Sequence, residues 1–225
     1  MTIYSITPKR HRSMHGVECM FYASRWFIDL PNRLQDLSFW ADRQSRPVLI
    51  EISNTPNDIR RYSTEQVDEG VAKLKAQIDI ARTKCPNGPI GVFATLPIWD
   101  EGAAIAGDDA WREANRYLQP LADLVDFVNP LIYMHADSPD PELWEKAAKA
   151  AIAEAEIYGK PIYPSIMPQY HHGMNSDLSY KMVPPLVWKK MLTLCRDRCD
   201  GAILFVGEGI QTDDDRWIRD LEKIA

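Results

Sequence analysis

The sequence has no long apolar run and few cysteines. No stretch reaches the roughly 20 consecutive apolar residues that a membrane-spanning helix needs, and residues 1–12 carry no apolar run after their basic residues. We therefore expect neither a membrane anchor nor a secretory signal. The cysteines are too few and too scattered for a disulfide framework, which favours a cytoplasmic protein with reduced thiols. They are Cys19, Cys85, Cys195 and Cys199.

An excess of positive charge is also lacking. The chain has 26 Lys and Arg against 32 Asp and Glu, which gives a net charge of −6. Because binding to nucleic acid phosphates requires a basic surface, this balance argues against a nucleic acid partner. The basic cluster at residues 9–12 is short, and we interpret it as a solvated terminal segment.

Several signature motifs are missing as well. The chain has no GxGxxG or GxxxxGK[ST] loop for a nucleotide, and no GxSxG elbow for a serine hydrolase. We therefore expect no cofactor.

Five short segments are rich in β-branched and aromatic residues and are apolar on both faces, as buried parallel strands are. They are residues 48–53, 90–95, 125–133, 161–166 and 201–206. Helical patterns lie between them. The clearest begins at the capping-box sequence Ser63-Thr64-Glu65-Gln66 and ends near Cys85-Pro86. Two further helices are expected, one capped by Asp108 or Asp109 and one that starts at Ser138-Pro139 and ends at Gly159.

Strands that recur about every 35–42 residues with helices between them predict repeated βαβ units and a parallel sheet. The sequence predicts an α/β fold, a TIM-type (β/α) barrel that is incomplete or irregular, with six to eight strands. An open doubly wound sheet is the alternative, but it usually carries a Gly-rich turn after its first strand.

We expect one domain over residues 1–225, in which residues 1–47 are irregular. Within that part, a strand is expected in Val17–Phe27 and a helix in Leu34–Arg43, while a strand at Ile3–Ile6 is poorly marked. An incomplete barrel would leave a sheet edge exposed. Such an edge is usually covered by a terminal segment or a partner, so residues 1–47 or a second copy in a homo-oligomer could cover it.

In (β/α) barrels, reactive groups follow the carboxyl ends of the strands. Acidic and aromatic side chains gather at these positions. Such a mixture suits a carbohydrate, since aromatic rings stack on sugar C–H faces while polar groups bind the hydroxyls. The expected substrate contacts are Trp99, Tyr133, Tyr163, Gln169, Tyr170 and His171.

Cleavage of a glycosidic bond usually requires two carboxyl groups. Glu51 is the first candidate, because a carboxylate within an apolar strand needs a partner or a function. Asp100 and Glu208 are its candidate partners, and Asp100 is expected in a loop together with Glu101.

The side chains of His135-Ala136-Asp137 and His171-His172 are of the types that bind divalent metal ions, so a metal site is an alternative to sugar contacts. No His-x-His occurs on an early strand, where metal-dependent barrel hydrolases usually carry one. We therefore favour sugar-contacting or loop histidines, and expect no metal.

The strings Pro47-Val-Leu-Ile-Glu-Ile-Ser53 and Val125-Asp-Phe-Val-Asn-Pro-Leu-Ile-Tyr133 resemble glycoside-hydrolase barrels of the hyaluronidase-like kind. This resemblance spans residues 47–208 and implies sugar contacts at Trp99, Tyr133 and Tyr163. The family's acidic motif is Asp-x-Glu, with Glu as general acid. Here it falls on Glu51-Ile52-Ser53, so a serine stands where the resemblance implies the acid.

These features favour a glycoside hydrolase-like enzyme that acts on a carbohydrate polymer by carboxylate general acid/base catalysis. A non-catalytic glycan-binding or assembly protein on a degenerate barrel is the first alternative. A metal-dependent hydrolase is the second.

Overall fold

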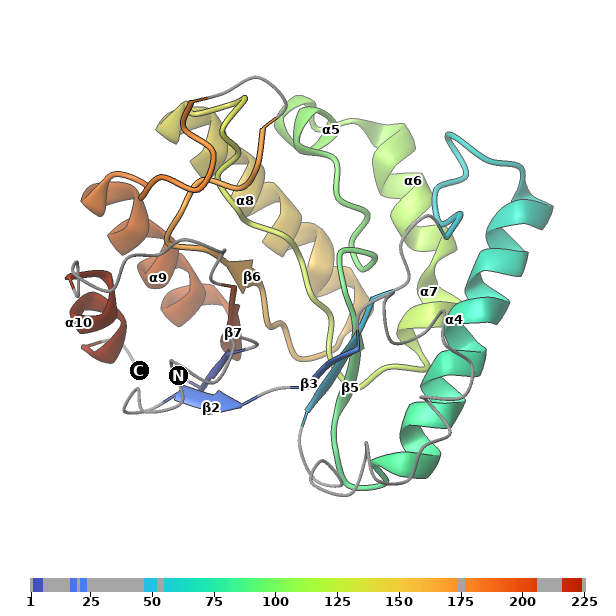
Figure 1. Cartoon of the computed structure of the whole chain (residues 1–225). Coiled ribbons are helices and arrows are strands. Elements are labelled where there is room, and N and C mark those ends of the chain that lie inside the picture. Colours follow the sequence, from blue (N-terminus) through green and yellow to red (C-terminus); the bar gives the residue numbers. More distant parts are fainter. Residues whose placement is uncertain are drawn as a thin grey trace.

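The computed structural model describes residues 2–5, 17–19, 21–23, 47–51, 55–173, 177–205 and 216–223. It is a mixed α/β structure in which every pair of adjacent strands is parallel (Figure 1). None of the helices in this part of the chain is long and apolar enough to cross a membrane. The strands are β1 (Thr2–Ser5), β2 (Val17–Cys19), β3 (Phe21–Ala23), β4 (Val48–Ile50), β5 (Ile90–Val92), β6 (Ser165–Ile166) and β7 (Gly201–Leu204). The helices are α4 (Thr64–Lys84), α5 (Glu101–Ala106), α6 (Asp109–Tyr117), α7 (Gln119–Ala122), α8 (Pro141–Ala155), the 3-10 helix η2 (Glu156–Tyr158), α9 (Pro185–Arg198) and α10 (Arg216–Glu222).

The strands form two small parallel sheets, with the orders β2-β1-β7-β6 and β3-β4-β5. Single parallel bridges join Phe93 to Asn129, Val128 to Ile162 and Leu131 to Ser165. Residues 128–131 therefore lie between the end of β5 and the segment that contains β6. A parallel α/β arrangement is confirmed, but the described residues do not show a closed barrel.

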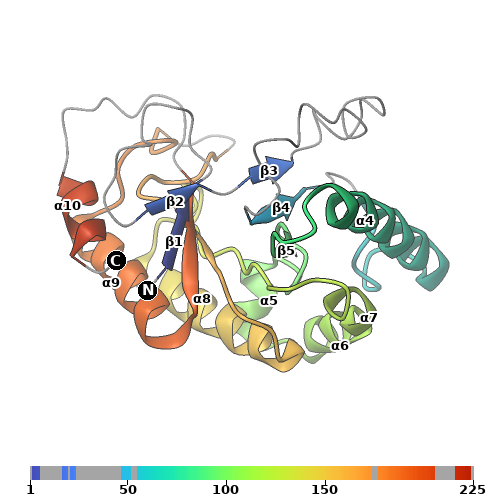
Figure 2. The same ribbon diagram turned by 90° about the horizontal axis from the view of Figure 1, so that it is seen from below.

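The helices lie in an arc along one side of the strands (Figure 2). Successive residues of β4 alternate between two apolar layers. Val48 and Ile50 pack in the cluster beneath α4–α8, whereas Leu49 packs with Phe127 and Ile203 in a separate cluster. The strand is thus buried on both faces, which is why it reads as a continuous apolar run.

Local signals place most helix ends. The Ser63 hydroxyl accepts a hydrogen bond from the Gln66 N–H, and the Gln66 side chain accepts one from the Ser63 N–H, so the predicted capping box is confirmed. Asp140 caps α8, and the glycine that follows η2, Gly159, has a φ of +63°. A left-handed residue of this kind ends a helix readily when it is glycine.

Two expectations differ from the structure. The predicted loop at residues 100–101 is instead the start of α5, which Asp100 caps. The single helix expected to follow Asp108 is divided into α6 and α7, with Pro120 in the first turn of the second. Proline is tolerated in a first turn but not in a helix interior. The helix expected at residues 34–43 lies outside the described residues.

Candidate functional site

Four rings lie together where neighbouring strand segments end. The Trp99 indole stacks on the His135 imidazole, with centroids 4.7 Å apart. The His135 and His171 rings meet edge to face at 4.9 Å, and His171 stacks on Tyr133 at 5.2 Å. We call Trp99, Tyr133, His135 and His171 the ring cluster.

The backbone holds the ring cluster in register. His135 and His171 form a parallel bridge, in which the His171 N–H donates to the Met134 carbonyl at 2.8 Å and the Ala136 N–H donates to the His171 carbonyl at 3.1 Å. Tyr133 and His135 are two residues apart in an extended segment, so their side chains point to the same face. Ile132 and Met134 pack in the cluster beneath α8 and α9 instead.

Both imidazoles of the ring cluster are neutral at pH 7. Burial, assisted by the neighbouring His171, lowers the pKa of His135 to about 4, and burial also lowers the pKa of His171. The His135 Nε2 and His171 Nδ1 atoms are buried, and neither makes a hydrogen bond with a described residue. Because such atoms are costly to bury unpaired, they are candidates for contact with a ligand.

A pocket of about 420 Å³ lies against the ring cluster and shares Trp99 with it. Glu51 lies in its wall, directly after β4, together with Phe93 and Thr95 after β5. The carboxyl-terminal ends of two neighbouring strands thus supply a carboxylate and aromatic surface to one pocket.

Ion pairs fix one wall of this pocket. The Arg60 guanidinium lies 2.8 Å from the Asp58 carboxylate and 3.0 Å from the Asp100 carboxylate. Burial opposes ionisation of Asp58, but hydrogen bonds from Arg60 outweigh it and lower the pKa of Asp58. Asp100 also lies 3.5 Å from Arg61 and accepts a hydrogen bond from the Ala103 N–H as the cap of α5. These contacts tie the segment after β4 to the segment before α5.

Glu101 has a different environment from Asp100. It is the first residue of α5 and accepts one hydrogen bond, from the Ser138 hydroxyl at 3.3 Å. Burial raises the pKa of Glu101, and the bond from Ser138 only partly opposes this. A carboxyl group with a raised pKa is suited to carry a proton, as a general acid must.

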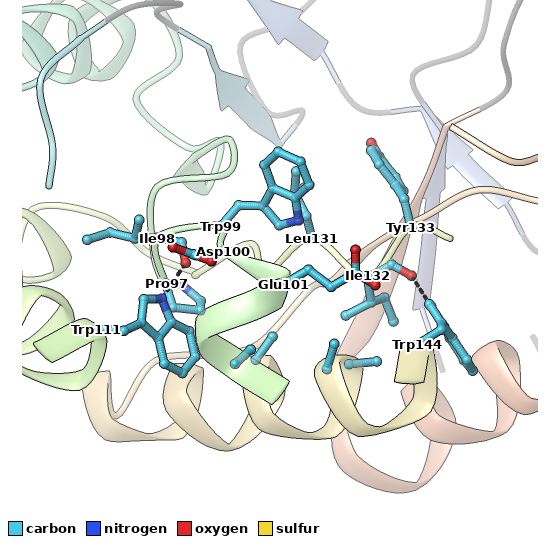
Figure 3. Close-up of a pocket in the computed structure, with 14 residues that line it drawn as sticks. Pro97, Ile98, Trp99, Asp100, Glu101, Trp111, Leu131, Ile132, Tyr133 and Trp144 are labelled. Atoms are coloured by element: carbon cyan, nitrogen blue, oxygen red, sulfur yellow. Dashed lines mark hydrogen bonds between the residues drawn. The ribbon is translucent and has the colours of Figure 1, made fainter. Parts of the chain in front are cut away.

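Figure 3 shows how these side chains lie around a crevice above α8. The rings of Trp99 and Tyr133 both point away from α8, on the side of the strands, with Glu101 between them. The crevice holds only about 20 Å³, roughly the space of one water molecule, so it is a packing gap and not a substrate site.

The structure separates the other predicted substrate contacts from the ring cluster. Tyr163 packs against Tyr4 and Phe127 near the start of β7, and Tyr170 lies among the apolar side chains beneath α8 and α9. Gln169 is buried, and its amide donates to the Tyr180 carbonyl at 2.7 Å. As substrate contacts, these three stay predictions. Glu208 lies outside the described residues.

The sequence marked two further residues of the site only in general terms: His135 as a sugar-contacting or loop histidine or a metal ligand, and Glu101 as a loop acid. Alternation along residues 131–135 could have placed His135 beside Tyr133. No comparable signal marks Glu101, because the start of α5 was expected to be a loop. Among the described residues, no three His, Cys, Asp or Glu side chains are grouped closely enough to hold a metal ion.

No protein family matches this sequence, and no curated protein matches it. Two solved structures of bee venom hyaluronidase are similar in fold, each with a TM-score of 0.61. One, in complex with a hyaluronic acid tetramer, is 11% identical, and the match covers 87% of this chain and 70% of that one. The other is 12% identical over 86% and 71% of the two chains. This chain therefore has a fold similar to that of bee venom hyaluronidase, in agreement with the resemblance noted in its strands.

Proposed function

We propose that this protein binds a carbohydrate at the ring cluster and the adjoining pocket, and acts on it as a glycoside hydrolase. The observation that carries the proposal is the ring cluster itself, in which two neutral imidazoles lie between Trp99 and Tyr133 beside a pocket that contains Glu51. The fold similarity to bee venom hyaluronidase supports it.

The chemistry of these groups suits a sugar. Trp99 is 45% exposed and offers an aromatic face, on which the C–H face of a sugar ring can stack. The buried imidazole nitrogens can hydrogen-bond to hydroxyl groups without carrying a charge. A pocket of about 420 Å³ falls within the range of roughly 300–1,000 Å³ that is typical of small-molecule sites.

Two carboxyl groups serve the cleavage step in this proposal. Glu101, whose pKa is raised by burial, lies beside Trp99 at the edge of the pocket and protonates the leaving glycosidic oxygen, while Glu51 in the pocket wall takes a proton from the attacking water. Asp100 and Glu208 are the partners predicted from the sequence. We favour Glu101 over Asp100 because Asp100 already pairs with Arg60 and Arg61 and caps a helix.

The proposal includes a closed barrel. β2 and β3 are one residue apart in the sequence, and each pairs with a different sheet. The close succession of β2 and β3 along the chain brings the sheets together on one side, while the bridges at residues 128–131 join them on the other. The ring cluster then lies at the carboxyl-terminal mouth, where active sites of such barrels occur.

A reducing-sugar assay tests the catalytic part. The probes are the hyaluronic acid tetramer and chitotetraose, as an anionic and a neutral oligosaccharide. We expect cleavage of one probe by the wild type and loss of cleavage in Glu51→Gln and Glu101→Gln. Glu69→Gln, on the exposed face of α4, is the control and should keep full activity. Cleavage that survives Glu51→Gln would refute the role of Glu51.

A binding protein without hydrolase activity is the second candidate. The observation that favours it is Ser53, which stands where the Asp-x-Glu motif of hyaluronidase-like enzymes has its acid. Calorimetry with the same two oligosaccharides distinguishes the candidates. Binding without release of reducing ends selects the binding protein.

A further inference from the structure

We infer that Trp111 and Trp144 are positioning residues that aim the rings of Trp99 and Tyr133 into the site. The expected effect on sugar binding rests on the proposed function, whereas the positioning of the two rings does not. Both tryptophans are 2% exposed, lie on helices outside the strands, and take no part in the ring cluster.

The same hydrogen bond occurs in two consecutive strand–helix units. The Trp111 indole N–H, on α6, donates to the carbonyl of Ile98 at 2.9 Å. The Trp144 indole N–H, on α8, donates to the carbonyl of Ile132, also at 2.9 Å. Each acceptor is the residue directly before a ring of the cluster, and each donor follows its acceptor by 13 or 12 residues (Figure 3).

Ile98 is held through both of its backbone groups. Its N–H donates to the Asn115 side-chain oxygen at 2.8 Å, while its carbonyl accepts from Trp111. Asn115 is fully buried and lies one helical turn after Trp111 on α6. Two bonds from one helix therefore fix the peptide units on either side of Ile98, and with them the direction in which the next side chain leaves the backbone.

This arrangement explains how an exposed ring keeps a defined place. Trp99 is 45% exposed, and the ring contact described for it is the stack on His135. A buried anchor directly before it limits its motion without covering its face. Tyr133 is held by the equivalent anchor and stacks on His171. The two anchors thus hold the two ends of the ring cluster.

NMR of the histidine side chains tests the inference without a sugar. We expect Trp111→Phe, which removes the indole N–H but keeps an aromatic ring, to move the His135 imidazole signals. Trp144→Phe should move those of His171. Trp188→Phe is the matched control, since its buried indole N–H donates to the Trp217 carbonyl at 3.1 Å and not to a residue that precedes a ring of the cluster. It should lower stability while leaving the His135 and His171 signals in place.

Unchanged His135 signals in Trp111→Phe would contradict the inference. If Trp111→Phe lowers stability as Trp188→Phe does but leaves the His135 signals and titration unchanged, Trp111 is merely structural and the inference is wrong. Should Trp111→Phe fail to fold, Asn115→Ser removes the other anchor of Ile98 and is read out in the same way.

Binding adds a second readout. If either oligosaccharide binds the wild type, Trp111→Phe should weaken that binding, by up to about 10²-fold if the ring moves by about 1 Å. Trp188→Phe should leave the affinity unchanged. If neither oligosaccharide binds, the proposed function fails, while the NMR result still decides whether the two tryptophans position the rings.

Discussion

The histidine at the centre of the ring cluster makes stability depend on pH. His135 has an ordinary pKa of 6.5, which burial and the neighbouring His171 lower to about 4 in the folded protein. Between these two values the unfolded chain binds a proton that the folded protein does not. The free energy of unfolding therefore falls as the pH falls from 6.5 to 4, and this contribution levels off below pH 4.

The size of the effect follows from the shift. At about 1.36 kcal/mol per pKa unit, a shift from 6.5 to about 4 corresponds to a loss of about 3 kcal/mol across this window. Burial lowers the pKa of His171 as well, which adds a loss in the same direction.

Urea unfolding at a series of pH values from 7.5 to 4 measures this loss in the wild type and in His135→Gln. Carboxyl groups titrate in both proteins, so the difference between the two profiles isolates His135. We expect the profile of the variant to be shallower by about 3 kcal/mol over the window. His172→Gln, an exposed histidine that stacks on Tyr180, serves as the control and should follow the wild type. Equal pH dependence in His135→Gln and the wild type would refute the reasoning.

Two further predictions concern stability. A Cβ added at Gly91 would lie 2.2 Å from the Phe127 ring, so Gly91→Ala should destabilise the protein by about 1–3 kcal/mol, measured by urea unfolding. If this variant is as stable as the wild type, the close packing of β5 against the Phe127 ring is contradicted. Arg60→Met should cost about 3 kcal/mol, because it deprives the buried Asp58 carboxylate of its main partner. Lys75→Met, which breaks an exposed pair, should cost less than about 1 kcal/mol, and equal losses in the two variants would contradict the account.

The sequence predicts elements best where one local signal decides them. The capping box at Ser63 and the apolar strand at 48–50 depend on neighbouring residues alone, so α4 and β4 follow from the sequence. Gly159 likewise ends the helical stretch at residues 141–158 where expected. The parallel α/β class follows from the regular recurrence of such segments.

The site is less predictable because tertiary contacts decide it. In the sequence, Asp100 looks like a free loop carboxylate. In the structure, its carboxylate pairs with Arg60, which is 40 residues away, and caps the start of α5. Tyr133 and Tyr163 both lie in short apolar segments that the sequence predicts to be strands. Only the strand pairing shows that Tyr133 belongs to the ring cluster, whereas Tyr163 packs against Tyr4 and Phe127.

Binding of oligosaccharides to Trp99 variants tests the central claim most directly. Calorimetry with chitotetraose and the hyaluronic acid tetramer should show binding of one of them to the wild type, and binding about tenfold weaker or more to Trp99→Ala, a difference of about 1.4 kcal/mol. Leu186→Ala, which changes an apolar side chain that is 68% exposed on α9, should bind like the wild type. If Trp99→Ala binds as tightly as the wild type, or if neither oligosaccharide binds the wild type, the ring cluster is not a carbohydrate site.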